Sequence, residues 1–349
     1  MRAAYERATV LELGARGVLD GAPFTLAGRT CVRGRRGAIW NEWRLSFEDG
    51  RSLFLVESPL GLAVYDEGTL TPAFASVTVG APLDTGFVVV DRGEATRVAQ
   101  WGDVEDAPSR YAYADLSSRA GAVATIDFGA ASGPSAGGGD LSSSPPRVYV
   151  GRKVGFAEVG LSPVSACEPL LIRAPEVSRP AGVETWLEIG DEGELDGVRF
   201  RVAGVLGRCL DVGTDERVSW EEYLLVARGV GGVRWLVVAS GHWSFVEPVE
   251  AGLVGESEAS ASLDGVVYDF LSEGTARVEW AAGDLPWEVA IGDASSVKDF
   301  VHAPWVLTKE WTSDELTWSR AIHVRPDAIA KAFGKRSLPR PRGRAPNEP

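Results

Sequence analysis

LELGARGVLDGAPFTLAGR, residues 11–29, returns as LEIGDEGELDGVRFRVAGV at residues 187–205, with ten of the nineteen aligned positions identical. Each copy carries an Asp-Gly dipeptide between apolar residues: Asp20-Gly21 and Asp196-Gly197. This dipeptide tolerates the positive φ angles of a tight hairpin turn. Solenoid repeats are about 20–50 residues long. The much larger spacing here therefore predicts two copies of one folding unit.

The repetition extends along the chain in short blocks. The further matches are residues 40–43 with 220–223, 93–96 with 274–277, 102–104 with 283–285, and 158–161 with 315–318. Insertions and deletions between the blocks are expected to lie in surface loops. We therefore expect a first copy at residues 1–175 and a second copy at residues 183–334.

Short alternating apolar segments between glycines and prolines predict an all-β protein. We expect each copy to begin with a small SH3-like barrel or rolled sheet that further strands complete. Residues 287–291 are among the expected strands. The best helix candidate is residues 327–333, which follow Pro326 and end at Gly334.

Two segments are expected to lack regular structure. Residues 130–146 are rich in Gly, Ser and Pro and form a loop insertion within the first copy. The tail at residues 335–349 is basic and Pro-rich, and we expect it to be disordered because it carries few apolar residues.

Composition limits the classes of function. The net charge of −14 argues against nucleic-acid binding, which needs a basic surface, and favours basic partners. No apolar run approaches the roughly 18 residues of a membrane span, so we expect no direct membrane insertion. Cys31, Cys167 and Cys209 have no zinc or dithiol spacing, and we interpret them as reduced and buried in a cytoplasmic protein.

The sequence offers no catalytic motif. His242, His302 and His323 share no metal-binding spacing, and none has a histidine at the matched position of the other copy. A G-x-S-x-G match at residues 133–137 lies within the Gly/Ser/Pro-rich insertion rather than between a strand and a helix, and there is no phosphate-binding glycine loop. We therefore expect no catalytic residue, no metal ligand and no cofactor.

A Trp-x-Glu-aromatic block is the best candidate for binding. In a strand, residues two apart share a face, so Trp40 and Glu42 face one side, and Trp220 and Glu222 repeat the arrangement. An aromatic ring beside a carboxylate can hold a cationic amine, Lys or Arg. The alternative is that the aromatics are core residues and the Glu pairs with an Arg on a neighbouring strand. Trp243 is a further binding candidate.

These motifs together resemble a bacterial family, domain of unknown function 4178. The resemblance rests on the spaced glycines around each Asp-Gly turn, the Trp-x-Glu-aromatic blocks, and the segments VYVGRKVGFAEVGL (148–161) and WEVAIGDASSVKDFVHAPWVLTKEWTSDELTWS (287–319). It covers residues 11–325 in two tandem copies. The family has no established activity. The resemblance implies a partner related to membrane stress, whereas the expectation of a basic partner rests on the negative net charge.

From these observations we expect a non-enzymatic cytoplasmic binding or scaffold module that acts through protein–protein interaction. The alternative is a sensor or carrier of a small cation such as a polyamine. An enzyme is the third possibility. The sequence does not indicate the oligomeric state.

Overall fold

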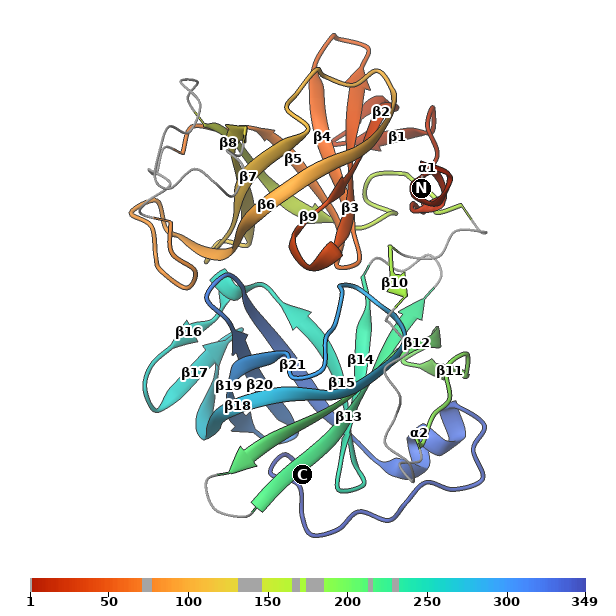
Figure 1. The fold of residues 1–349 in the computed structure, drawn as a ribbon, viewed down its shortest axis with the longest axis vertical. Coiled ribbons are helices and arrows are strands. Elements are labelled where there is room, and N and C mark those ends of the chain that lie inside the picture. Colours follow the sequence, from red (N-terminus) through yellow and green to blue (C-terminus); the bar gives the residue numbers. More distant parts are fainter. Residues whose placement is uncertain are drawn as a thin grey trace. The chain divides into compact units, whose positions relative to one another are not determined.

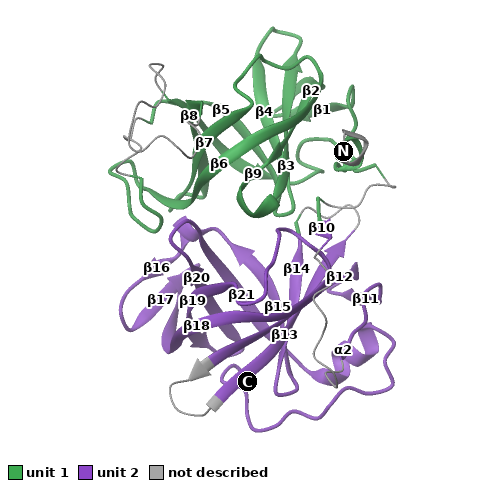
Figure 2. Ribbon diagram, viewed as in Figure 1, with its two compact units in different colours: residues 1–171, 228–232 green, residues 172–227, 233–349 purple. Residues whose placement is uncertain are grey.

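The computed structural model describes residues 2–70, 77–130, 146–164, 170–173, 185–212, 216–227 and 232–349. The chain forms two compact units. Unit 1 comprises residues 1–171 with 228–232, and unit 2 comprises residues 172–227 and 233–349 (Figure 2). Most of the predicted loop at 130–146 lies outside the described residues, as do residues 176–182 between the two expected copies.

Unit 1 is a closed barrel of eight antiparallel strands (Figure 1). Helix α1 (Arg2–Arg7) and strand β1 (Arg16–Leu19) precede it. The barrel strands follow the order β2-β3-β4-β5-β9-β8-β7-β6, and β6 pairs again with β2. They are β2 (Ala22–Arg33), β3 (Ile39–Phe47), β4 (Ser52–Ser58), β5 (Gly61–Glu67), β6 (Phe87–Gly102), β7 (Arg110–Ser118), β8 (Ala122–Ala130) and β9 (Arg147–Val154).

Unit 2 repeats this topology. Its barrel order is β12-β13-β14-β15-β21-β20-β19-β18, closed by β12 with β18, and three short strands and helix α2 (Pro326–Ala332) are added. The added strands are β10 (Ile172–Arg173), β16 (Gly255–Glu256) and β17 (Ser260–Leu263), and β11 (Glu192–Leu195) corresponds to β1. The barrel strands are β12 (Val198–Val212), β13 (Glu216–Ala227), β14 (Arg234–Ala239), β15 (His242–Val249), β18 (Val266–Leu285), β19 (Ala294–His302), β20 (Trp305–Trp311) and β21 (Leu316–Val324).

The predicted hairpin turns are present in both units. Asp20 and Gly21 have φ angles of 49° and 81°, and Asp196 and Gly197 have 50° and 75°. Two successive residues with positive φ form the type I′ turn that Asp-Gly favours. The all-β fold with two tandem barrel units is confirmed. The additional strands that we expected in each copy complete the barrel itself.

The seam that closes each barrel passes through two facing glycines. Gly28 of β2 pairs with Gly102 of β6, and Gly204 of β12 pairs with Gly283 of β18. A β-carbon on Gly28 would lie 2.0 Å from the backbone oxygen of Asp103, and the equivalent distance at Gly204 is 2.4 Å. A side chain would therefore push the strands apart. The repeated glycines of the sequence mark the places where the barrels close.

The prediction of a strand at residues 287–291 is wrong. These residues form a loop after β18, in which Val289 is buried. The backbone N–H of Ala290 donates to the Asp293 carboxylate at 2.9 Å, and Gly292 has a φ of 84°. The apolar residues thus anchor a turn rather than pair with a strand.

The last block of the sequence alignment is also wrong. Residues 316–318 belong to β21, and its pairing makes β21 equivalent to β9 rather than to residues 158–161. Val159 follows β9 and Ile329 follows β21, and both are completely buried against the core of their own unit. A pattern of four residues is too short to define an alignment across a variable loop.

The predicted C-terminal helix is present as α2, whereas α1 has no sequence prediction. Ile329 and Phe333 pack in the apolar core of unit 2. Within the described residues, no helix combines the length and the apolar character needed to cross a membrane.

The tail differs from the expected disordered segment. Residues 335–349 have no regular secondary structure, but Leu338 packs against the core of unit 2. The backbone N–H of Arg342 donates to the Ser240 carbonyl at 2.9 Å, and Asn347 is buried. The tail is held because its few apolar side chains and its backbone polar groups find partners on unit 2.

Two of the three cysteines lie within the described residues. Cys31 and Cys209 are buried free thiols. Burial raises the pKa of Cys31 to about 11, so the thiol stays protonated at neutral pH. Cys167 lies outside the described residues.

Candidate functional site: the interior of the first barrel

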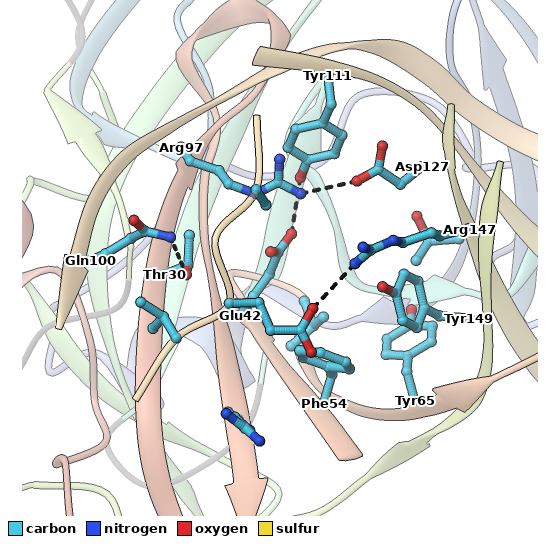
Figure 3. A pocket seen from close by; sticks show the side chains of 16 residues that line it. Thr30, Glu42, Phe54, Tyr65, Arg97, Gln100, Tyr111, Asp127, Arg147 and Tyr149 are labelled. Carbon is cyan, nitrogen blue, oxygen red and sulfur yellow. Dashed lines mark hydrogen bonds and ion pairs between the residues drawn. The ribbon is translucent and has the colours of Figure 1, made fainter. Parts of the chain in front are cut away.

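A partly open pocket leads into the barrel of unit 1 (Figure 3). All eight barrel strands contribute to its lining, which places it inside the barrel. One lining residue from each strand is Thr30, Glu42, Phe54, Tyr65, Arg97, Tyr111, Asp127 and Tyr149. The opposite faces of the same strands carry apolar cores that include Trp43, Leu45 and Leu55.

Glu42 forms the centre of the polar side of the pocket. Its Oε1 accepts hydrogen bonds from Trp40 Nε1 at 3.2 Å and from the Tyr111 hydroxyl at 2.9 Å. Burial raises the pKa of Glu42, and the charge of Arg97 and these two hydrogen bonds counteract part of that shift. Glu42 is therefore a carboxyl group whose ionised form is poorly solvated.

Arg97 bonds to another carboxylate. Its guanidinium donates to Asp127 Oδ2 at 3.0 Å and to the Pro108 carbonyl at 2.6 Å, and it lies 3.9 Å from the centroid of the Tyr111 ring. No described residue forms an ion pair with Glu42. The carboxylate of Glu42 thus faces the pocket within the field of Arg97 but without an ion pair of its own among the described residues.

Aromatic rings form the opposite side. Figure 3 shows Phe54, Tyr65 and Tyr149 gathered on one side of the space, and Glu42, Arg97 and Tyr111 on the other. Phe54 and Tyr149 meet edge to face with ring centroids 5.3 Å apart. Such rings provide apolar surface and a negative face that attracts cations.

At the mouth, the remaining arginines are tied to rim carboxylates. Arg44 lies 2.9 Å from Asp103, and Arg147 lies 3.1 Å from Glu105. Each guanidinium among the described lining residues is thus matched by an acid other than Glu42.

Unit 2 contains the same frame. The strand registers make Glu222 equivalent to Glu42, Trp220 to Trp40, Glu310 to Asp127 and Ser295 to Tyr111. These equivalences follow because the residues pair with corresponding residues of the neighbouring strands in the two barrels. Trp220 Nε1 donates to Glu222 Oε1 at 2.7 Å, as Trp40 does to Glu42.

The arginine of this frame comes from a different strand in each unit. In unit 1, Arg97 of β6 pairs across the seam with Val32 of β2. In unit 2, Arg208 of β12 pairs with Val278 of β18, at the equivalent positions with the two residue types exchanged. Arg208 bonds Glu222 at 3.2 Å and Glu310 at 2.8 Å, and its guanidinium lies 5.7 Å from the centroid of Trp220.

A comparison with protein-family models matches residues 188–326 to the domain of unknown function DUF4178. The second barrel is a DUF4178 domain. The match spans every barrel strand of unit 2, whereas the relation of unit 1 to it rests on the shared topology and registers. Searches of curated proteins and of solved structures found no match.

The interior of the DUF4178 barrel of unit 2 is apolar where that of unit 1 is polar. Leu206, Leu224 and Ala281 stand at the positions of Thr30, Arg44 and Gln100, and all three are at most 3% exposed. Polar residues open this region of unit 1, and aliphatic packing fills it in the DUF4178 barrel.

A further aspartate occupies the same position in each of the two barrels. Asp115 in unit 1 and Asp299 in the DUF4178 barrel each face a threonine on the next strand, Thr125 and Thr308. Burial raises the pKa of Asp115 to about 7, and the neighbouring carboxylate of Asp91 adds to the shift. Burial also raises the pKa of Asp299, which accepts from Thr308 at 2.7 Å.

The structure places the predicted binding residues in different environments. Trp40 and Glu42, and Trp220 and Glu222 of the DUF4178 barrel, lie together on interior faces. Trp243 is completely buried and stacks on Tyr223, with centroids 5.9 Å apart. The expectation that Trp243 contacts a partner is therefore wrong, because its position corresponds to a core leucine of unit 1, Leu62.

Sequence reasoning missed the residues that complete the pocket. Tyr111, Asp127, Tyr149 and Arg97 lie more than 50 residues from Glu42 in sequence and meet it only because the barrel closes. One signal was available: Tyr111 and Asp127 lie in strands whose alternation predicts one face shared by polar and aromatic residues.

Proposed function

We propose that this protein is a non-enzymatic cytoplasmic binding module that acts through a protein partner, with the pocket of unit 1 as the binding site. The observation that carries the proposal is the pocket itself. Concave sites with apolar aromatic walls and a few convergent polar groups are the usual form of a ligand site. Phe54 and Tyr149 supply the wall, and Glu42 supplies the polar group.

The chemistry of the lining favours binding over catalysis. The described lining residues include no serine, cysteine, histidine or lysine, and the acid–base groups Glu42, Tyr111 and Asp127 are engaged in hydrogen bonds with one another or with Arg97. Tyr111 and Arg97 are held by hydrogen bonds to Glu42 and Asp127. A rigid polar frame of this kind suits recognition.

Affinity capture from lysates of the source cells, with quantitative mass spectrometry, tests the proposal. We expect the full-length protein to enrich a defined partner and the variant Phe54→Ala to lose it. The matched control is Trp235→Ala, because Trp235 occupies the position of Phe54 in the second barrel. Equal enrichment by the wild-type protein and Phe54→Ala would contradict a role for the pocket, provided that thermal unfolding shows both variants folded.

A further inference from the structure

We infer that the pocket of unit 1 takes a single cationic group carried on an apolar stem, with Glu42 as its counter-ion and the rings of Phe54, Tyr65 and Tyr149 around the stem. This inference rests on the proposed function and names the chemistry of the ligand. The cation is an amine or a guanidinium, which a small molecule or a basic side chain of a partner can supply.

The second barrel shows how this frame holds a cation. There the guanidinium of Arg208 lies between Glu222 at 3.2 Å and Glu310 at 2.8 Å, beside the ring of Trp220. In unit 1 the frame is repeated, but Val32 replaces that arginine. A frame that binds a cation in one copy thus retains its glutamate in the other copy without a pairing arginine.

The charge balance of the lining leaves one carboxylate for a ligand. Arg97 is bound to Asp127, while the two rim arginines are bound to Asp103 and Glu105. Glu42 is the acid that remains without an ion pair among the described residues. A charged ligand group beside this half-buried carboxylate, which has no ion pair, offsets part of the cost of its ionisation.

A single carboxylate without an ion pair can balance one positive charge on the ligand. A polyamine would bring two or more cations, and the additional charges would face the arginines Arg44, Arg97 and Arg147. Like charges at close range are unfavourable in a partly enclosed site. The pocket therefore favours a monovalent cation over the polyamine of our alternative hypothesis.

The aromatic side determines what carries the charge. The rings of Phe54 and Tyr149 meet edge to face with their centroids 5.3 Å apart, and Val56 pairs with Glu42 on the neighbouring strand. A hydrocarbon stem can be buried here while its charged end reaches the carboxylate. Burial raises the pKa of Glu42, so a bound cation also favours release of the Glu42 proton.

Isothermal titration calorimetry with phenethylamine, 2-phenylethanol and 3-phenylpropanoate tests the charge preference on one skeleton. Because a charge-assisted hydrogen bond is worth about 1.5–3 kcal/mol, we expect the amine to bind at least about tenfold more tightly than the alcohol. The substitution Glu42→Gln should abolish that advantage and leave alcohol binding unchanged. The matched control Glu222→Gln, at the equivalent position of unit 2, should preserve it.

Further titrations use only the wild-type protein. Because burial raises the pKa of Glu42, amine affinity of the wild-type protein should rise with pH as Glu42 ionises, whereas alcohol affinity stays constant. Spermidine should bind no more tightly than phenethylamine. Nα-acetyl-lysine methylamide, compared with butylamine, distinguishes a partner's side chain from a free amine: tighter binding of the lysine derivative identifies a protein source, and tighter binding of butylamine identifies a small molecule.

The outcomes separate the two proposals. Equal affinity for amine and alcohol, or tightest binding of the carboxylate, would overturn the cation inference while the pocket remained a binding site. If none of the probes bound, the cation inference would fail, and affinity capture with Phe54→Ala would still test the proposed function separately.

Discussion

Val32 and Arg97 face each other across the seam that closes the barrel of unit 1, and the equivalent pair of unit 2 has the same two residue types exchanged between the strands. In unit 1 this guanidinium forms an ion pair with Asp127 of β8, and in unit 2 it forms one with Glu310 of β20. The interior therefore requires one arginine at the seam, and either strand can supply it. The choice of strand decides whether Glu42 or Glu222 is paired.

This exchange predicts that the two arginine positions compensate for each other. Arg97→Val should destabilise unit 1 by roughly 3 kcal/mol, because it leaves the largely buried Asp127 without its cation. The double variant Val32→Arg/Arg97→Val should recover at least half of that loss, since the new arginine copies the arrangement of unit 2. Native-state hydrogen exchange of the unit 1 strands measures the free energy of unfolding for this unit.

The reciprocal pair in unit 2, Arg208→Val and Val278→Arg, is the control. Additive losses in both double variants would show that the two positions do not share one role.

Asp115 predicts a dependence of stability on pH. Its pKa is about 7 in the folded protein and 3.8 in a model peptide, so the folded state retains a proton that the unfolded state loses. Stability from this group is therefore complete below about pH 4 and is lost as the pH rises toward 7. Asp115→Asn removes the titration, and it should raise the melting temperature relative to wild type more at pH 8 than at pH 4.

Carboxyl carbon NMR measures the titration of Asp115 directly. The neighbours that act on its pKa are Asp91 and Glu42, whose charges raise it, and Thr125, whose hydrogen bond lowers it. Asp91 in turn accepts from the Tyr113 hydroxyl at 2.8 Å and lies 3.7 Å from Arg35. A midpoint near 4, or a stability difference that is the same at both pH values, would contradict the prediction.

The glycine seam predicts different costs for three alanine substitutions. Gly28→Ala and Gly204→Ala place a β-carbon against the backbone of the closing strand, and each should destabilise its own unit by roughly 3 kcal/mol. Gly50→Ala has open space around it and should cost only about 1 kcal/mol, from its φ of 85°. Hydrogen exchange reports each unit separately. A small effect at both seam glycines would show that the barrels close without close contact.

Truncation after Gly334 tests the role of the tail. The tail buries Leu338 and bonds to Ser240 and Pro304, so its removal should lower the melting temperature by a few degrees, as expected for a loss of about 1 kcal/mol. Differential scanning calorimetry of the full and truncated chains provides the measurement. An unchanged melting temperature would show that these contacts contribute nothing to stability.

Local sequence patterns were enough to predict the secondary structure in most places. The Asp-Gly turns at Asp20 and Asp196 follow from backbone preference alone, and the alternation of the strand correctly places Trp40 and Glu42 on one face. Residues 287–291 were mispredicted because apolar residues that anchor a loop have the same composition as a strand.

The site itself depends on contacts distant in sequence. Glu42 was correctly selected, but nothing in its neighbourhood indicates that Tyr111 and Tyr149 close around it. A sequence alignment of the two copies does not reveal that valine and arginine are exchanged between the two strands. It shows only an unrelated substitution at Val32 and another at Arg97. It becomes visible only when strand pairing shows that the two positions face each other.

Methyl NMR during a titration with phenethylamine tests the central claim most directly. Val56 lines the pocket of unit 1, and Val237 occupies the equivalent position in unit 2. We predict a saturable shift of the Val56 methyl signals that Glu42→Gln weakens, while the Val237 signals stay fixed. A saturable shift of Val237 with no shift of Val56 would contradict the assignment of binding to the first barrel.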